Sequence, residues 1–477
     1  MDNKYKRLGF NTFFVFIGNV GPRLISFVLM PFYTFWLSKE DFGIQDIMSI
    51  YAVLIIPYVT LGLYEAIFVY PKGKNKILQS KYFTSVILVV SFLIVLCVLF
   101  LSFLPVSWSC VIFSDKLHDY IPLLAFMIAI NSFQRILQSF TRGIDKMRVF
   151  SITGVVYALV MTLLALFLIP LLGLKGYWIA LLTAEFISCL YVVVAIRAWT
   201  YITFNELNVS YIKELLAFSI PLIPNATMWW IINSINRPIL ISTVGLDGVG
   251  LFSIAGKFPS ILSLLFGIFF SAFQISALEE FGKDSYSRFY NNVFRIVLFV
   301  QVCIMFLLML LGQLIFDIMI DEKFHDAVYY LPILCLGVII SNIAAYVGVT
   351  FTVLKRTKVF LYSAILAACV ALIANFLLIP SIGIMGACLS IVLSQLVMII
   401  YRWFKSSPFV DFVNKPYLVI LIVNIMAALL IYYLIENLLT KQLVVLTLFI
   451  VFIYLNKDVL NSLAIIMNKT LMKFINR

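Results

Sequence analysis

Apolar runs of about twenty residues follow one another along nearly the whole chain. Such a run matches the roughly 30 Å of hydrocarbon in a bilayer, because an α-helix rises about 1.5 Å per residue. The composition agrees, since 63% of the 477 residues are hydrophobic and 12% are charged, against roughly 25% charged in soluble domains. The chain is therefore predicted to be an all-α polytopic membrane protein.

Fourteen runs are long and apolar enough to be predicted as transmembrane helices. They are 8–36, 43–69, 82–104, 121–141, 149–171, 176–196, 215–243, 250–277, 289–313, 328–353, 359–380, 384–404, 417–435 and 441–456. The last run is short, and the tail after it alternates polar and apolar residues like an interfacial amphipathic helix. Totals of twelve or thirteen helices therefore stay open.

The basic residues predict the orientation. With the amino terminus inside, twenty-four of the 34 Lys and Arg fall in inner loops and tails, counting Arg402 at the inner end of run 384–404 with them, and five fall in outer loops. The remaining five lie within the runs: Arg23, Arg135, Arg237, Lys257 and Arg295. Because cytoplasmic loops carry an excess of Lys and Arg, both termini are predicted to be cytoplasmic. This bias also explains the net charge of +12 without nucleic acid as a partner.

Two stretches 210 positions apart share the frame L-I-P-x-x-G-x-x-G, at 168–176 and at 378–386. KMRVF and RTKVF, at 146–150 and 356–360, match at the same offset. These matches indicate two six-helix lobes of the same orientation, related by an axis along the membrane normal. The predicted parts are an amino-terminal lobe (1–205), a carboxy-terminal lobe (206–410), and an additional helix pair with an amphipathic tail (411–477).

Three cations lie deep in the apolar runs. Arg23 is near the middle of the first run, Arg237 is in the outer half of the seventh, and Lys257 is two turns below the outer end of the eighth. A charge at the bilayer centre costs at least about 2.5–3.5 kcal/mol, so such residues usually face a protein interior or a wet cavity. Arg135 and Arg295 are close enough to the cytoplasmic face to snorkel.

Asparagines and prolines accompany two of these cations. Asn19 shares a helix face with Arg23, whereas Asn225, Asn233 and Asn236 gather on the face of Arg237. Prolines interrupt both runs, and the carbonyls they free must face protein or water. Bent helices with polar faces in equivalent places predict the walls of a central aqueous cavity that binds substrate. The alternative is that the Asn side chains hold neighbouring helices together.

Two acids in the runs of the first lobe are predicted to be buried. Glu185 is in the middle of the sixth run, and the aligned position of the second lobe holds the neutral Gln395. This difference favours a charge-dependent role for Glu185, as an ion-pair partner of Arg23 or as a carrier of a coupling proton. Glu65 is expected to pair with Arg135 near the cytoplasmic face.

The sequence offers little for catalysis or metal binding. The seven Cys have neither metal nor redox spacing, and the two His lie in separate loops. Outer loops are short, and no soluble domain is inserted. The protein is therefore expected not to be an enzyme, with no catalytic residues, no metal site and no cofactor. Coupling to protons or to sodium stays open.

Seven short segments carry a family resemblance. They are LMP (29–31), FWLSKEDFG (35–43), LGLYEA (61–66), FSIPLIP (218–224), INRPILIS (235–242), GLFSIAGK (250–257) and NFLLIPSIGIMGA (375–387). In these segments the chain resembles the polysaccharide transport family, the O-antigen flippase branch of the multidrug/oligosaccharidyl-lipid/polysaccharide exporter superfamily. The segments follow the family's order over nearly the whole chain.

The resemblance implies movement of undecaprenyl-diphosphate-linked oligosaccharide from the cytoplasmic to the outer leaflet of the bacterial cytoplasmic membrane, by alternating access. It implies that the partners are the lipid bilayer and other polysaccharide assembly proteins. Where this family usually has Asp-Arg, the chain has Asn236 and Arg237. Arg237 is therefore expected to lack a neighbouring counter-ion and to be free for a substrate phosphate, which Arg binds bidentately. Trp229 and Trp230 are expected to stack on sugar rings.

Two other functions stay open. A cation-coupled multidrug exporter of the same superfamily would carry cationic drugs and would need acids in its cavity, whereas most deep charges here are positive. A membrane glycan polymerase would need a sizeable outer loop or a catalytic set of His and Asp.

Overall fold

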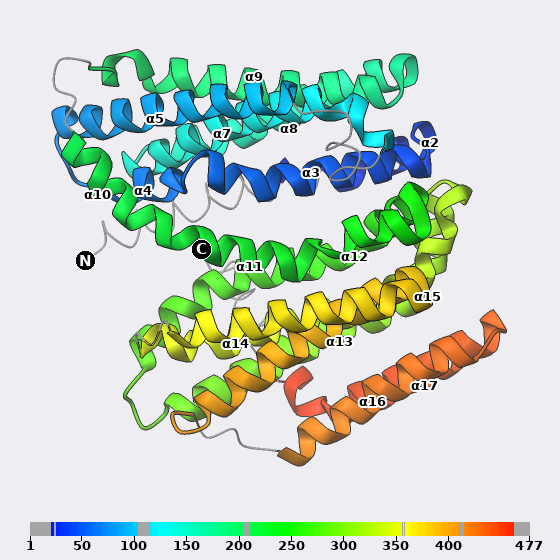
Figure 1. Cartoon of the computed structure of the whole chain (residues 1–477). Coiled ribbons are helices and arrows are strands. Elements are labelled where there is room, and N and C mark those ends of the chain that lie inside the picture. The colour runs from blue at the N-terminus through cyan, green and yellow to red at the C-terminus, as the bar shows by residue number, and fades with distance from the viewer. Residues whose placement is uncertain are drawn as a thin grey trace, which may run out of the picture. The chain divides into compact units, whose positions relative to one another are not determined.

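The computed structural model describes residues 21–22, 25–103, 115–203, 209–354, 356, 358–410 and 415–461 (Figure 1). Every regular element in these ranges is an α-helix or a 3₁₀-helix. This confirms the all-α prediction. In a bilayer it is also the expected solution, because a helix satisfies its own backbone polar groups.

Ten helical stretches among the described residues are long and apolar enough to cross a membrane. Two of them, Ser210–Glu280 and Lys358–Ser406, each cover two of the predicted spans. Val419–Leu434 is a shorter apolar helix, and most of the first predicted run lies outside the described residues. The protein is thus a multi-pass membrane protein, and the total of fourteen crossings stays a prediction.

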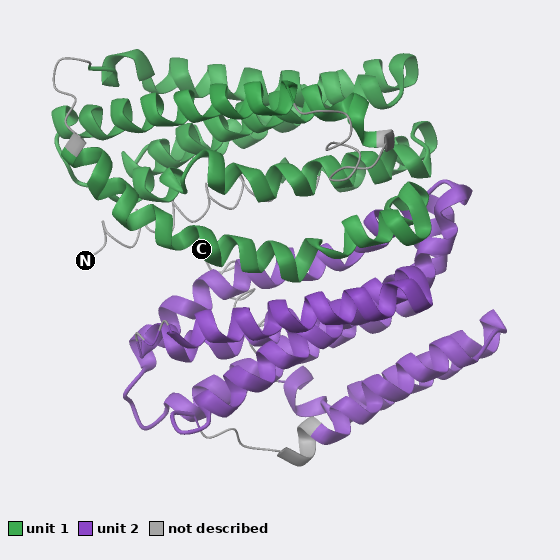
Figure 2. Cartoon of the chain, in the orientation of Figure 1, with its two compact units in different colours: residues 1–250 green, residues 251–477 purple. Residues whose placement is uncertain are grey.

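The chain divides into two compact units, residues 1–250 and 251–477 (Figure 2). The first unit holds α2 (Met30–Trp36), α3 (Lys39–Val59), α4 (Leu63–Val69), α5 (Lys76–Ser102), η1 (Asp115–Tyr120), α7 (Ile121–Gly143), α8 (Met147–Leu172), α9 (Leu174–Ile196), η2 (Ala198–Tyr201), α10 (Val209–Ser219), η3 (Ile220–Leu222) and α11 (Ile223–Ser234). The next helix, α12 (Asn236–Glu280), starts in this unit and continues into the second.

The second unit continues with six further elements. They are α13 (Tyr286–Met319), η4 (Glu322–Tyr330), α14 (Leu331–Val353), α15 (Lys358–Ser406), α16 (Lys415–Leu434) and α17 (Leu438–Leu455). The unit boundary at residue 250 differs from the predicted lobe boundary at 205, because 209–250 packs on α3, α4 and α5. The lobes are defined by the sequence repeat, and their boundary stays a prediction.

Two predicted spans are broken at the positions that local sequence dictates. A capping box between Ser38 and Asp41 starts α3, and the left-handed Gly62 (φ 66°) separates α3 from α4. The proline-rich run 215–243 becomes α10, the 3₁₀ turn η3 and α11, followed by the start of α12. The predicted interruption of this run by proline is therefore confirmed.

Helices in the two halves of the chain begin 210 positions apart. This holds for α5 and α13, which start at Lys76 and Tyr286, and for α7 and α14, which start at Ile121 and Leu331. The L-I-P-x-x-G-x-x-G turns also share one backbone conformation. Gly173 has φ 56° and ψ −131°, and Gly383 has φ 58° and ψ −132°. The duplication inferred from sequence therefore extends to backbone geometry.

The second glycine of each turn lies against the preceding helix. A Cβ on Gly176 would be 2.1 Å from the carbonyl oxygen of Leu168, and a Cβ on Gly386 would be 2.3 Å from that of Leu378. Only glycine fits at such a distance from backbone. The turns are thus scaffold that packs α8 on α9, and the two halves of α15 on each other.

Gly176→Ala and Gly386→Ala are expected to destabilise the purified protein in detergent by at least about 1–3 kcal/mol, because the added carbon overlaps backbone that side-chain motion cannot relieve. A thermal-unfolding series measures the effect. Gly267→Ala is the matched control, since nothing lies within 4 Å of the added carbon in α12 and alanine favours helix. Unchanged melting temperatures for both turn variants would contradict the packing role.

Candidate functional site

Two sets of helices meet along one line in the first unit. The chain 39–70, which forms α3 and α4, lies antiparallel to 214–250, which forms α10, α11 and the start of α12 (Figure 1). We call this contact the seam. It joins a helix pair of the predicted amino-terminal lobe to the first helices of the predicted carboxy-terminal lobe.

Glycines bring the two backbones together at both ends of the seam. A Cβ on Gly43 would be 2.1 Å from the carbonyl oxygen of Leu246, and one on Gly250 would be 2.0 Å from that of Lys39. At the other end, a Cβ on Gly62 would be 2.9 Å from the carbonyl oxygen of Ser219. Small residues that let helix backbones touch are typical of membrane helix pairs.

An ion pair lies inside the seam. Arg237 Nε donates to Asp46 Oδ2 at 3.1 Å, and both side chains are more than four-fifths buried. Arg237 Nη1 also donates to Asn236 Oδ1 at 3.0 Å and to the carbonyl oxygen of Asn233. The expectation that Arg237 lacks a counter-ion was wrong, because α3 supplies the carboxylate that position 236 does not.

Asp46 was missed by the sequence reasoning although the signal was present. It stands as an acid inside the predicted run 43–69, where an ionisable residue is a functional candidate by default. Its partner is 191 positions away, so its role could not be assigned from spacing.

Tryptophans and hydroxyls complete the seam. Trp230 is buried, and its Nε1 donates to the carbonyl oxygen of Ile50 at 2.7 Å. The oxygens of Tyr58 and Thr227 share a hydrogen bond of 2.7 Å. Trp230 is therefore held between helices and is not available to stack on a sugar, contrary to expectation. Trp229 keeps 36% of its surface exposed.

The three predicted asparagines have different surroundings. Asn236 is 1% exposed, and its Nδ2 has no hydrogen-bond partner. Asn233 is exposed and donates to the carbonyl oxygen of Trp229 at 2.8 Å, and Asn225 is exposed. Of the polar face predicted on this segment, Asn236 is therefore buried in the seam, whereas Asn225 and Asn233 are exposed.

The other predicted cations are placed as follows. Asn19 and Arg23 lie outside the described residues. Lys257 lies on α12 in the second unit, where its side chain is exposed and no described carboxylate forms an ion pair with it. Arg237, in contrast, makes several polar contacts within the described chain.

Glu185 is buried between α7 and α9. It is 6% exposed, and its Oε2 accepts from Asn131 Nδ2 at 2.9 Å. One turn along, Gln134 Nε2 donates to Ser188 Oγ at 2.9 Å across the same two helices. Asn131 was not identified from sequence, although an amide inside an apolar run is a recognisable signal.

The predicted pair of Glu65 and Arg135 does not form. Glu65 is exposed rather than buried, and the ion pairs of the described chain do not include it. The Arg135 guanidinium instead lies 5.8 Å from the centroid of the Tyr64 ring. The tyrosine next to Glu65 therefore provides the cation contact.

The second unit buries a further arginine, which the charge pattern had assigned to a cytoplasmic loop. Arg402 is 3% exposed within α15. Its Nε donates to Ser363 Oγ at 3.0 Å, and its Nη1 donates to the carbonyl oxygen of Ala344 at 2.8 Å. The guanidinium also lies 5.1 Å from the Phe360 ring centroid. The Arg402 side chain, near the end of α15, thus links α14 to Ser363 and Phe360 near the start of α15.

Comparison with known proteins gives the family. The model of the family described as polysaccharide biosynthesis protein matches residues 8–275. The capsular polysaccharide biosynthesis protein CapF of Staphylococcus aureus is 25% identical over 232 residues, which is 46% of this chain and 58% of CapF. The match thus spans less than two thirds of that relative.

The solved structures of two transporters have a similar fold. An inward-facing multidrug resistance MATE transporter of the MOP superfamily aligns with a TM-score of 0.66 and 13% identity, over 81% of this chain and 95% of that one. The lipid II flippase MurJ, in an inward closed conformation, aligns with a TM-score of 0.65 and 16% identity, over 94% of this chain and 99% of its own. Because the family model covers more than half of the sequence, the chain belongs to the polysaccharide biosynthesis protein family, as the resemblance implied.

Proposed function

We propose that the protein is a flippase for undecaprenyl-diphosphate-linked oligosaccharide repeat units, of an O-antigen or a related surface polysaccharide. It moves them from the cytoplasmic to the outer leaflet of the bacterial cytoplasmic membrane by alternating access between the two lobes. Both termini are cytoplasmic. The family membership supports this proposal, and so does the fold shared with a protein named as a lipid II flippase.

The observation that carries the proposal is Arg237 within the seam. Its guanidinium contacts Asp46, Asn236 and a backbone carbonyl, and a diphosphate competes for the same donors because Arg binds phosphate oxygens as a fork. The seam joins the two predicted lobes, so it parts when they separate. A substrate anion then compensates the Arg237 charge in place of Asp46.

Exposed groups on α11, the helix that precedes Arg237, suit the sugar part of the substrate. Asn225 and Asn233 offer amides for hydroxyls, and Trp229 offers a ring face. Arg23, Asn19 and Lys257 remain proposed substrate-binding residues. Other polysaccharide assembly proteins are proposed partners, because they would supply and consume the repeat unit.

The cation-coupled drug exporter is the second candidate. The MATE relative supports the fold alone at 13% identity. The ion pair occupies Asp46 and Arg237 alike, so it does not select between a cationic and an anionic substrate. The excess of basic residues among the deep charges favours the anionic one, and a polymerase has no further support.

Deletion of the gene is expected to abolish the surface polysaccharide and to leave the lipid-linked repeat unit in the cytoplasmic leaflet. Glycan staining and extracted lipid-linked intermediates measure this, and the wild-type gene on a plasmid is the control. Raised sensitivity to cationic drugs with intact polysaccharide would favour the exporter instead. Single repeat units stalled in the outer leaflet would indicate a polymerase.

Neutralising the ion pair tests Arg237. Arg237→Ala alone leaves a buried carboxylate, which costs about 3–5 kcal/mol. The informative variant is therefore Asp46→Asn with Arg237→Gln, which keeps the seam neutral. We expect normal protein in the membrane and at least about tenfold less surface polysaccharide, since a hydrogen bond to a charged group is worth about 1.5–3 kcal/mol.

The matched control neutralises an exposed pair of the same charges. Lys283→Gln with Glu280→Gln removes a bond of 2.7 Å at the surface, where such pairs contribute about 0–1 kcal/mol. Wild-type polysaccharide is expected from it. The same result from the seam variant would make Arg237 and Asp46 a structural pair only.

Glu185 is the proposed site of a coupling proton. Glu185→Gln keeps the size of the side chain and a bond to Asn131 but cannot exchange a proton. We expect polysaccharide export to fall to background at a normal protein level. Gln134→Ala, which removes a neutral bond between the same helices, is expected to retain export. Wild-type export by Glu185→Gln would reduce Glu185 to a packing residue and favour sodium or uncoupled transport.

A further inference from the structure

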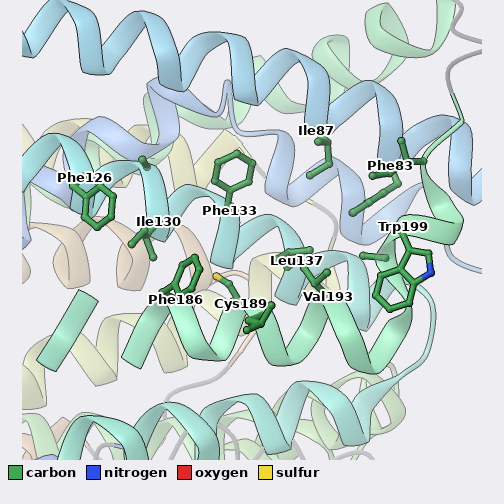
Figure 3. Close-up of a pocket in the computed structure, with 14 residues that line it drawn as sticks. Phe83, Ile87, Phe126, Ile130, Phe133, Leu137, Phe186, Cys189, Val193 and Trp199 are labelled. Carbon is green, nitrogen blue, oxygen red and sulfur yellow. The ribbon is translucent and has the colours of Figure 1, made fainter. Parts of the chain in front are cut away.

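An apolar slot of about 530 Å³ lies in the first unit among α5, α7, α9 and η2 (Figure 3). It extends along the helices from Phe126 and Phe186 at one end, past Phe133, to Phe83 and Trp199 at the other. Its lining contains no charged, amide or hydroxyl side chain. Hydrocarbon therefore suits the slot and water does not.

The slot is open on one side. Phe126, Phe186 and Trp199 line it and keep 55%, 58% and 56% of their surfaces exposed. In a multi-pass membrane protein such uncovered rings meet lipid chains. None of the lining residues belongs to the seam, so the slot is separate from the Arg237 site.

Basic groups lie at the end marked by Trp199. Lys76 Nζ is 5.3 Å from the centroid of the Tyr201 ring, and that ring packs edge-on against Phe83 of the slot. Arg197 is exposed and directly precedes Ala198, which lines the slot. The loop charges predict that this end is cytoplasmic, and Trp is typical of a membrane interface. An apolar slot with cations at its interfacial end is complementary to an anionic lipid.

We propose that this slot holds the polyprenyl chain of the diphosphate lipid in the cytoplasmic leaflet, with its diphosphate at Lys76 and Arg197, before the headgroup reaches the seam. The inference rests on the proposed function and names where the lipid part of the substrate is captured. A diphosphate carries more negative charge than a phosphodiester, so two cations favour it over a phospholipid. Methyl-branched alkene units also present flat faces to the five rings.

The test uses the full chain in phosphatidylcholine nanodiscs and an undecaprenyl diphosphate with a photoreactive diazirine in the chain. Crosslinked peptides are expected from α7 and α9 around Phe133 and Phe186. Excess undecaprenyl diphosphate should remove them, and the same excess of phosphatidylglycerol should not. Equal competition by phosphatidylglycerol would make the slot an ordinary lipid site, and crosslinks only elsewhere would also overturn the inference.

Filling the slot gives the first variant test. Ala129→Phe adds a ring to the lining of α7 and is expected to abolish the crosslinks to α9. The control is Leu163→Phe, which adds a ring at a position of α8 that is 58% exposed. Wild-type crosslinking by Ala129→Phe would contradict occupancy of the slot.

Removing the cations gives the second variant test. Lys76→Gln with Arg197→Asn is expected to weaken competition by undecaprenyl diphosphate about thirtyfold, which corresponds to about 1 kcal/mol for each basic group near the membrane surface. Asn suits position 197, where φ is 55°, because it tolerates the left-handed region. Lys405→Gln, at another exposed lysine, is the control. Equal affinity of the double variant and this control for undecaprenyl diphosphate would contradict a headgroup site at Lys76 and Arg197.

The two proposals fail differently. If the gene is needed for surface polysaccharide while the probe does not label the slot, the slot inference fails and the flippase stands. If deletion leaves both surface polysaccharide and lipid-linked intermediates unchanged, the flippase fails. Specific labelling that diphosphate lipid removes would then identify a lipid site without transport.

Discussion

The pairing of Arg237 with Asp46 is the interaction on which the seam depends. An arginine inside a bilayer is costly, and removing one partner of a buried pair leaves a charge that nothing compensates. The pair forms in a contact where Gly43 and Gly250 let two backbones approach so closely that a Cβ on either would overlap a carbonyl oxygen of the other chain segment. The backbone contact at these glycines and the neutralisation of Arg237 by Asp46 therefore stabilise the same helix contact.

The same seam contains three irregular places in its helices: Gly62, η3, and Gly245 of α12, where φ is 84° and ψ is −179°. The chain turns at Gly62 between α3 and α4, and the opposite chain turns at η3, whose neighbour Ser219 lies against Gly62. Non-helical backbone at membrane depth needs protein or water around it. The breaks at Gly62 and η3 pack against one another, so each is surrounded by protein. Changes of backbone dihedral angle concentrate at such breaks, so a change of backbone conformation within the seam is expected there.

The sequence predicted the structure correctly where a residue type acts through its own local chemistry and needs no partner. Apolar length located the helices, proline located η3, and the paired glycines located turns whose dihedral angles agree within 2°. It failed where a side chain needs a partner on another helix. A helical wheel gives the face of Arg237 or Glu185, but the rotation and neighbour of that helix decide whether Asp46 or Asn131 is within reach. Trp230 and Arg402 were misplaced for the same reason, since both bind backbone carbonyls of other helices.

The two halves of the duplicated chain keep their scaffold and differ in their polar pairs. Where α7 and α9 join Asn131 to Glu185, the second half has the buried Gln395, and Asn342 of α14 donates instead to Gln301 of α13 at 2.7 Å. A neutral amide pair holds helices together at little cost in hydrocarbon, whereas a carboxyl group is expensive unless it is protonated or paired. A purely structural contact would be served equally well by Gln in both halves. Under the proposed function, Glu185 of the first half is the group whose protonation would change the packing of two helices, while Arg237 of the seam is the charge that a diphosphate would compensate in place of Asp46.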